Sequence, residues 1–222
     1  MQTDHALLRL LQLSSVSLPV GAYSFSQGLE YSVEQEWVAN QDDAYDWLLV
    51  QFEKGFTHLD LAIVSRLYQA LDDNDQHRVI EWNHYLLACR ETHEFKLSDV
   101  AMGMALRRLL LKMDVEPVIS SDDEASFVTL FCIAAHQWQI NSRQCALGLA
   151  WSWLENQVAA ATKLIPLGQT QAQRLLSDLQ AVIPAAIDKA HAIEDEEIGF
   201  SLPALAIASS LHETQYTRLF RS

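Results

Sequence analysis

A serine-rich segment over residues 14–28, SSVSLPVGAYSFSQG, is the first part of the chain whose residue types could do chemistry. Ser24 or Ser26 could serve as the nucleophile of a hydrolase if a general base lay within hydrogen-bond reach. The segment lacks the G-x-S-x-G pattern of a nucleophile elbow, and no strand pattern precedes it. The simpler interpretation is a turn, in which Pro19 fixes φ, Gly21 permits a positive φ and serines cap helices. We therefore predict no catalytic residue.

Eight histidines, at positions 5, 58, 77, 84, 93, 136, 191 and 212, raise the question of a metal site. The sequence has no H-E-x-x-H motif, and its three cysteines, at 89, 132 and 145, form no C-x-x-C pair. Phosphate-binding glycine loops are also missing from the sequence. We predict neither a metal site within one chain nor a cofactor. A nickel site shared across a dimer, with one histidine such as His212 from each subunit, stays open.

The composition limits the class of protein. Of the 222 residues 50% are hydrophobic, which excludes a disordered chain, and only 7 are glycine and 5 proline, which favours helices over sheets. A net charge of -14 argues against nucleic acid as a partner. No run of about 18 apolar residues predicts a membrane span, and the N-terminus lacks the pattern of a signal peptide. Unpaired cysteines indicate a reducing compartment, so we expect a cytoplasmic protein.

Apolar residues recur at helical spacing along almost the whole chain. Examples are residues 4–13, the stripe from Tyr45 to Phe56, and the longest regular pattern over 172–187. These patterns predict one all-α domain over residues 1–222, a bundle of roughly eight to ten helices. The expected helix starts are a capping box at 121–124, Asn141-Ser142 and Thr170 with Gln173; the expected stops or kinks are Pro166-Leu-Gly168 and Pro184.

The C-terminal tail, residues 212–222 (HETQYTRLFRS), is the segment most suggestive of function. Chain ends are commonly disordered, yet this one combines aromatic residues, leucine and two arginines, which is the composition of interface anchors. We expect a tail that becomes ordered on binding a partner. Lys163 suits a helix C-terminus by its charge or contacts a partner. Without a family, the residues indicate a helical interaction protein that has no active site.

Three blocks of the sequence resemble the UreF family of urease accessory proteins. The first is Ser14-Ser15 with LPVGAYSFSQGLE from Leu18 to Glu30, and the second is WLENQVAAA from Trp153, followed by KLIPLGQ from Lys163 to Gln169. The third is SLPALAIASS over residues 201–210 with the tail itself. Val16 departs from the proline usual in the family, and Leu211 from a polar or basic residue.

The resemblance implies an all-α homodimer that acts as a urease maturation chaperone and is not an enzyme. Family members bridge UreD (also called UreH) and the GTPase UreG and help to deliver nickel to apo-urease. The N-terminal segment 1–28 and the tail 212–222 would be partner-binding extensions. The resemblance implies docking onto UreD for Tyr216, Arg218, Leu219, Phe220, Arg221 and Ser222, and coupling to UreG for Tyr23, Lys163 and Arg218. The alternative that remains is a metallochaperone that carries nickel on shared histidines.

Overall fold

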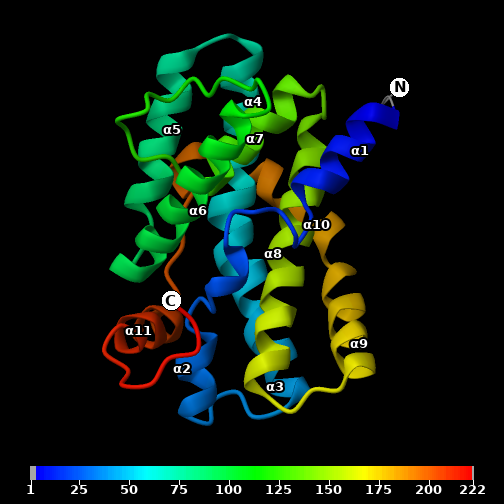
Figure 1. Ribbon diagram of the computed structural model, residues 1–222, viewed down its shortest axis with the longest axis vertical. Coiled ribbons are helices and arrows are strands. Elements are labelled where there is room, and N and C mark those ends of the chain that lie inside the picture. The colour runs from blue at the N-terminus through cyan, green and yellow to red at the C-terminus, as the bar shows by residue number, and fades with distance from the viewer. Residues whose placement is uncertain (1–3, 222) are drawn as a thin grey trace.

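The computed structural model describes residues 4–221, and over these residues the chain is all-α. Its α-helices are α1 (Asp4–Leu13), α2 (Leu29–Glu34), α3 (Gln41–Val50), α4 (Ala62–Asp72), α5 (Gln76–Ala88), α6 (His93–Leu111), α7 (Phe127–Gln137), α8 (Ser142–Leu164), α9 (Gln169–Gln180), α10 (Ile183–Ala192) and α11 (Pro203–His212). Helix α8 runs through the middle of the molecule (Figure 1). It packs against α1, α4, α7, α9 and α10. The predicted all-helical bundle is confirmed.

Helices α3 and α4 are joined into one long helix by a π-helical stretch, Gln51–Leu61. The predicted apolar stripe continues through the junction, since Leu48 and Phe52 are completely buried. Phe56 stacks on Trp153 of α8, with 5.2 Å between the ring centroids. When this long helix is counted once, the number of helices in the described residues lies within the predicted range. None of these helices is both long and apolar enough to cross a bilayer.

Side-chain caps start several helices, and two predicted starts are wrong. Asn141 caps α8 as predicted, because its Oδ1 accepts the amide of Gln144 at 2.9 Å. Residues 121–124 do not start a helix, since Arg107 donates to the carbonyls of Ser121 and Asp123, and α7 begins only after the cap Ser126.

The predicted start at Thr170 is also wrong, because α9 has already begun at Gln169. There the Gln171 side chain accepts the amide of Gly168 at 2.9 Å. The apolar pattern over 172–187 is divided between α9 and α10. Pro184 lies in the first turn of α10, and it has no amide proton to donate to the carbonyl of Gln180, where α9 ends.

A buried ion cluster, here called the Arg90 cluster, joins the π-helix to α6 and α7. The Arg90 guanidinium lies 2.6 Å from Asp60 Oδ1 and 2.9 Å from Asp99 Oδ2. Asp99 also accepts the Ser126 hydroxyl at 2.9 Å and the Phe127 amide at 2.8 Å, so it holds the start of α7 in place. Burial raises the pKa of Asp60, although the charge and hydrogen bonds of Arg90 oppose that shift.

Candidate functional site

The C-terminal tail folds back onto the segment around α2 at one end of the molecule (Figure 1). The amides of Leu219 and Phe220 donate to the two carboxylate oxygens of Glu30, at 2.5 and 2.9 Å, and the Arg221 amide donates to the Ser24 carbonyl at 2.8 Å. The expectation of a tail that orders only on binding is therefore not met by this structure. Backbone donors need acceptors, and the tail finds them on its own chain.

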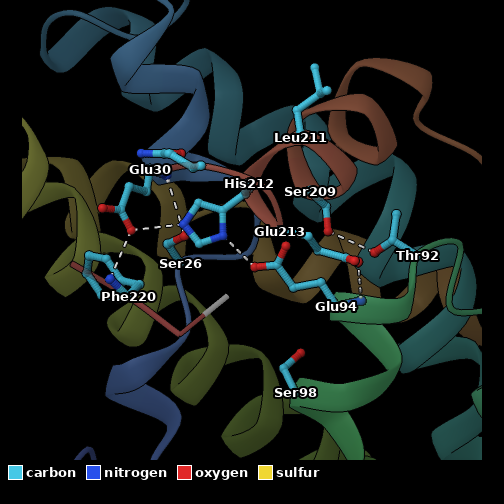
Figure 2. Close-up of polar contacts among 12 residues, drawn as sticks. Ser26, Glu30, Thr92, Glu94, Ser98, Ser209, Leu211, His212, Glu213 and Phe220 are labelled. Atoms are coloured by element: carbon cyan, nitrogen blue, oxygen red, sulfur yellow. Dashed lines mark hydrogen bonds and ion pairs between the residues drawn. The ribbon is translucent and has the colours of Figure 1, made fainter. Parts of the chain in front are cut away.

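His212, the last residue of α11, lies between two buried carboxylates (Figure 2). Its Nδ1 is 2.6 Å from Glu94 Oε1 and its Nε2 is 3.0 Å from Glu30 Oε2. The histidine is completely buried, and the two glutamates are 7% or less exposed. Three helix ends meet here, because Glu30 and Glu94 lie in the first turns of α2 and α6. Helix dipoles favour carboxylates at these N-termini and a cation at the C-terminus of α11.

This arrangement favours the imidazolium form of His212. Burial by itself lowers the pKa of His212, but the hydrogen bonds and charges of Glu94 and Glu30 outweigh burial, and the pKa is raised above its usual value. A doubly protonated ring donates from both nitrogens, as the two flanking carboxylates require. We call Glu30, Glu94 and His212 the His212 cluster.

Further hydrogen bonds attach the His212 cluster to its surroundings. The carboxylate of Glu213, the residue after α11, accepts the backbone amide of Glu94 at 3.1 Å. Thr92 and Ser209 share a hydrogen bond of 2.8 Å between their hydroxyl oxygens (Figure 2). The start of α6 and the end of α11 are thus joined at several points, and the tail leaves from a fixed position.

The structure brings together three residues that the resemblance assigns to partner contacts. The Lys163 ammonium, in the last turn of α8, lies 5.3 Å from the centroid of the Phe220 ring and 5.9 Å from that of Tyr23. Phe220 is only 5% exposed, so its ring packs beneath the tail and is not part of the exposed surface. The attraction of a cation to aromatic rings holds Lys163 over the tail.

The remaining predicted residues of the tail face outward. Tyr216 is fully exposed and Leu219 is 65% exposed. The side chains of Arg218 and Arg221 are exposed as well. We call Tyr23, Lys163, Tyr216, Arg218, Leu219 and Arg221 the tail surface. Ser222, which was also predicted to contact a partner, lies outside the described residues.

The His212 cluster is not arranged to hold a metal ion. Its carboxylates bond to opposite nitrogens of one ring, so the oxygen atoms do not converge on a common point. Among residues 4–221, no group of three or more histidine, cysteine, aspartate or glutamate side chains could hold a metal ion. Burial also keeps His212 away from any surface at which two subunits could share it.

Ser26 of the serine-rich segment is not positioned as a nucleophile in the structure. Ser26 is completely buried, and its hydroxyl lies near the backbone amide of Glu30 at 3.5 Å. The nearby Nε2 of His212 bonds to Glu30 instead of a serine. A cavity of about 150 Å³ lies among the π-helix, α6 and α8, and its lining includes Phe25 and Gln27 but neither Ser24 nor Ser26.

The sequence analysis missed Glu30 and Glu94 as members of a site. Glu30 closes the first sequence block, and Glu94 lies outside all three blocks and outside every predicted site. One signal was present: Gly28 before Glu30, and Thr92 before Glu94, mark helix starts with a glutamate in the first turn. The partner, His212, is more than 100 residues from either, so periodicity could not reveal the contact.

The fold and this site define an all-helical protein in which the exposed tail surface lies over the buried His212 cluster. A family model for UreF matches residues 38–180. The chain is 53% identical over 220 residues to the urease accessory protein UreF of Marinomonas sp. (strain MWYL1), which covers 99% of this chain and 96% of the relative. It is 46% identical to UreF of Teredinibacter turnerae over 99% of this chain and all of that protein. The chain belongs to the UreF family of urease accessory proteins.

Proposed function

We propose that this protein is an adaptor in urease maturation, a cytoplasmic homodimer that bridges UreD (UreH) and the GTPase UreG. In this role it helps to incorporate nickel into apo-urease, modulates GTP hydrolysis by UreG and performs no catalysis itself. The names of the relatives support the accessory role, and the resemblance described above supplies the partners. The tail surface would dock onto UreD, while Tyr23, Lys163 and Arg218 would couple the complex to UreG.

The observation that carries this proposal is the convergence of the predicted contact residues at one end of the molecule. Tyr23, Lys163 and the tail come from three distant parts of the sequence, yet Lys163 contacts the rings of both Tyr23 and Phe220. Exposed aromatic, leucine and arginine side chains on an ordered backbone match the composition of interface hot spots. The backbone of the tail bonds to buried Glu30, so these side chains are presented from a fixed position.

Capture of purified UreD by the immobilised full-length protein tests the proposal, with UreG and GTP added afterwards. A chain that lacks the last ten residues should lose UreD. Because that deletion also removes buried Phe220, the sharper variants are Leu219→Ala and Arg218→Ala, which change exposed side chains. Matched controls are Leu8→Ala, at 63% exposure on α1, and Arg174→Ala, exposed on α9. Capture unaffected by either tail variant, or lost equally in the controls, would contradict the assigned surface.

Arg218 has a second interpretation, as an arginine given in trans to the UreG active site to stabilise transition-state charge. Docking is the simpler role, so Arg218→Ala should first weaken assembly. Assembly intact together with altered GTP turnover would instead favour the second interpretation.

The alternative function is a nickel carrier that uses histidines shared between subunits. Burial of His212 between two glutamates disfavours that histidine as a surface ligand. Isothermal titration of the isolated protein with Ni²⁺ separates the two functions. Stoichiometric, tight binding would support the carrier, and weak or no binding would support the adaptor.

A further inference from the structure

The carboxylate of Glu30 bonds to residues outside its own short helix. Its two carboxylate oxygens accept the amides of Leu219 and Phe220, and Oε2 also accepts from His212. All three donors belong to the C-terminal end of the chain, about 180 to 190 residues away. A buried carboxylate costs free energy unless it is fully paired, so Glu30 and the tail depend on each other.

We propose that Glu30 is the positioning residue of the tail surface: it fixes the backbone of Leu219 and Phe220 so that the neighbouring side chains face outward for docking. This inference rests on the proposed function, since it names the group that prepares the proposed docking site. Glu30 itself contacts no partner, because it is 7% exposed beneath the tail.

The geometry of successive amides explains how one carboxylate orients the tail. The amides of Leu219 and Phe220 point to the same carboxylate, which places the Phe220 ring inward beneath Lys163 and leaves Leu219 exposed. The next amide, of Arg221, reaches the Ser24 carbonyl and extends the attachment by one residue. Three consecutive backbone bonds therefore fix the direction of the tail where its contact residues lie.

The charge of His212 is the second part of this attachment. The charged groups that bond to His212 are Glu30 from α2 and Glu94 from α6, and Glu213 bonds to the backbone of Glu94. A protonated His212 offsets the Glu30 charge, whereas a neutral ring keeps only one N–H and leaves one carboxylate facing a bare nitrogen. Deprotonation should therefore loosen the hold of Glu30 on the tail.

Glu30→Gln is the direct test, with Glu34→Gln as its matched control. Glutamine has nearly the same shape as glutamate, but one of its two oxygens is replaced by an NH₂ group, which cannot accept an amide. Glu34 lies one turn further along α2 and is exposed. Far-UV circular dichroism and urea unfolding of both variants show whether the helical body remains folded.

The first readout is hydrogen exchange of the Leu219 and Phe220 amides in the isolated full-length protein, as protection factors corrected for intrinsic rates. Both amides should be protected in the wild-type protein and in Glu34→Gln, and their protection should fall by about tenfold or more in Glu30→Gln. Wild-type protection should also decline between pH 6 and pH 9, while the Glu30→Gln protein should show little further change. Unprotected wild-type amides, or protection kept in Glu30→Gln, would overturn the proposal.

The second readout is the affinity for purified UreD, which should fall by about tenfold or more in Glu30→Gln and stay unchanged in Glu34→Gln. Loss of protection with unchanged affinity would overturn the positioning role, as would loss of affinity with protection kept. If the wild-type protein fails to bind UreD, the proposed function fails. The exchange readout still decides whether Glu30 holds the tail, because it needs no partner.

Discussion

The Arg90 cluster and the His212 cluster share one arrangement, and each takes one carboxylate from the N-terminal half of α6, Asp99 in the first and Glu94 in the second. In each, one cation lies between two buried carboxylates that belong to different parts of the chain. The Arg90 cluster joins the π-helix, α6 and the start of α7, whereas the His212 cluster joins α2, α6, α11 and the tail. The first connects elements of the body, and the second attaches a chain end.

The identity of the cation decides what each cluster can do. Burial alone lowers the pKa of Arg90, but the charges of Asp60 and Asp99 raise it overall, so the guanidinium stays charged at any pH at which the protein is folded. The imidazole of His212 starts from an ordinary pKa near neutrality, and its pKa is raised by the hydrogen bonds and charges of Glu94 and Glu30 against the opposing effect of burial, so the ring remains a group that can lose its proton as the pH rises. The Arg90 cluster therefore keeps its positive charge at every pH at which the protein is folded, whereas the His212 cluster loses its positive charge when His212 is deprotonated.

The largest expected effect is that of Arg90→Ala. It leaves Asp60 and Asp99 buried without their cation, and breaking a buried pair on one side costs about 3–5 kcal/mol. We expect that loss in the free energy of unfolding measured in urea at pH 7. The pKa of Asp60 is already raised by burial, so the variant should recover part of its stability at pH 5, where the carboxyl can take up a proton. Equal losses at both pH values would show that lost packing dominates.

His212→Gln should have a smaller effect. It should lower the free energy of local opening of the tail, measured by hydrogen exchange of its amides, by about 1–3 kcal/mol. The chain end can open locally and let water reach Glu30 and Glu94, which limits the loss for the body of the protein. Hydrogen exchange resolved by residue measures both at once. If the amides of α7 lose as much protection as those of Leu219 and Phe220, the two clusters are not independent.

Gly28→Ala tests the packing contact between α2 and α11, the helices that supply Glu30 and His212 to the His212 cluster. Gly28 has φ +81°, and an added Cβ would lie 3.2 Å from Leu205 Cδ1 and 3.4 Å from Ala208 Cβ. A left-handed conformation alone costs about 1–2 kcal/mol with a side chain. Gly21→Ala is the control, since Gly21 has φ +77° but open space around it. Thermal unfolding should show the larger loss for Gly28→Ala, and equal losses would exclude crowding as a cause.

The pH dependence of the stability of the wild-type protein should reveal the loss of charge at His212. Because the folded pKa of His212 is raised, its stabilisation is fully present below the unfolded value of 6.5 and is lost as the pH rises through the folded value. Urea unfolding between pH 6 and pH 9 should show this decline in the wild-type protein. The decline should be smaller in His212→Gln, and an identical decline in both proteins would assign it to another group.

The smallest effect is expected for Arg143→Gln. Its ion pair with Asp188 is close, at 2.5 Å, but the two side chains are 53% and 65% exposed, and such surface pairs contribute about 0–1 kcal/mol. Unfolding in urea at low and high salt checks this. A loss comparable to that of Arg90→Ala would show that burial does not explain the difference between these pairs.

Local signals in the sequence predicted much of the fold. The stripe from Tyr45 to Phe56 is one face of a helix, and Asn141 caps α8, because both depend on residues a few positions apart. The errors come from contacts that local patterns cannot contain. Residues 121–124 have the composition of a capping box, but Arg107 and Asn83 use their carbonyls and the helix starts later.

The sequence by itself determined that this protein is helical and that it resembles the UreF family, since composition, periodicity and motifs are local properties; partner contacts of the tail stay a prediction. Only the tertiary structure decided that the tail is attached to its own chain and that His212 is buried between Glu30 and Glu94. Those contacts join residues more than 100 positions apart. Their physical cause is the need of buried charges and backbone amides for partners, which only the packing of α2, α6 and α11 brings within reach.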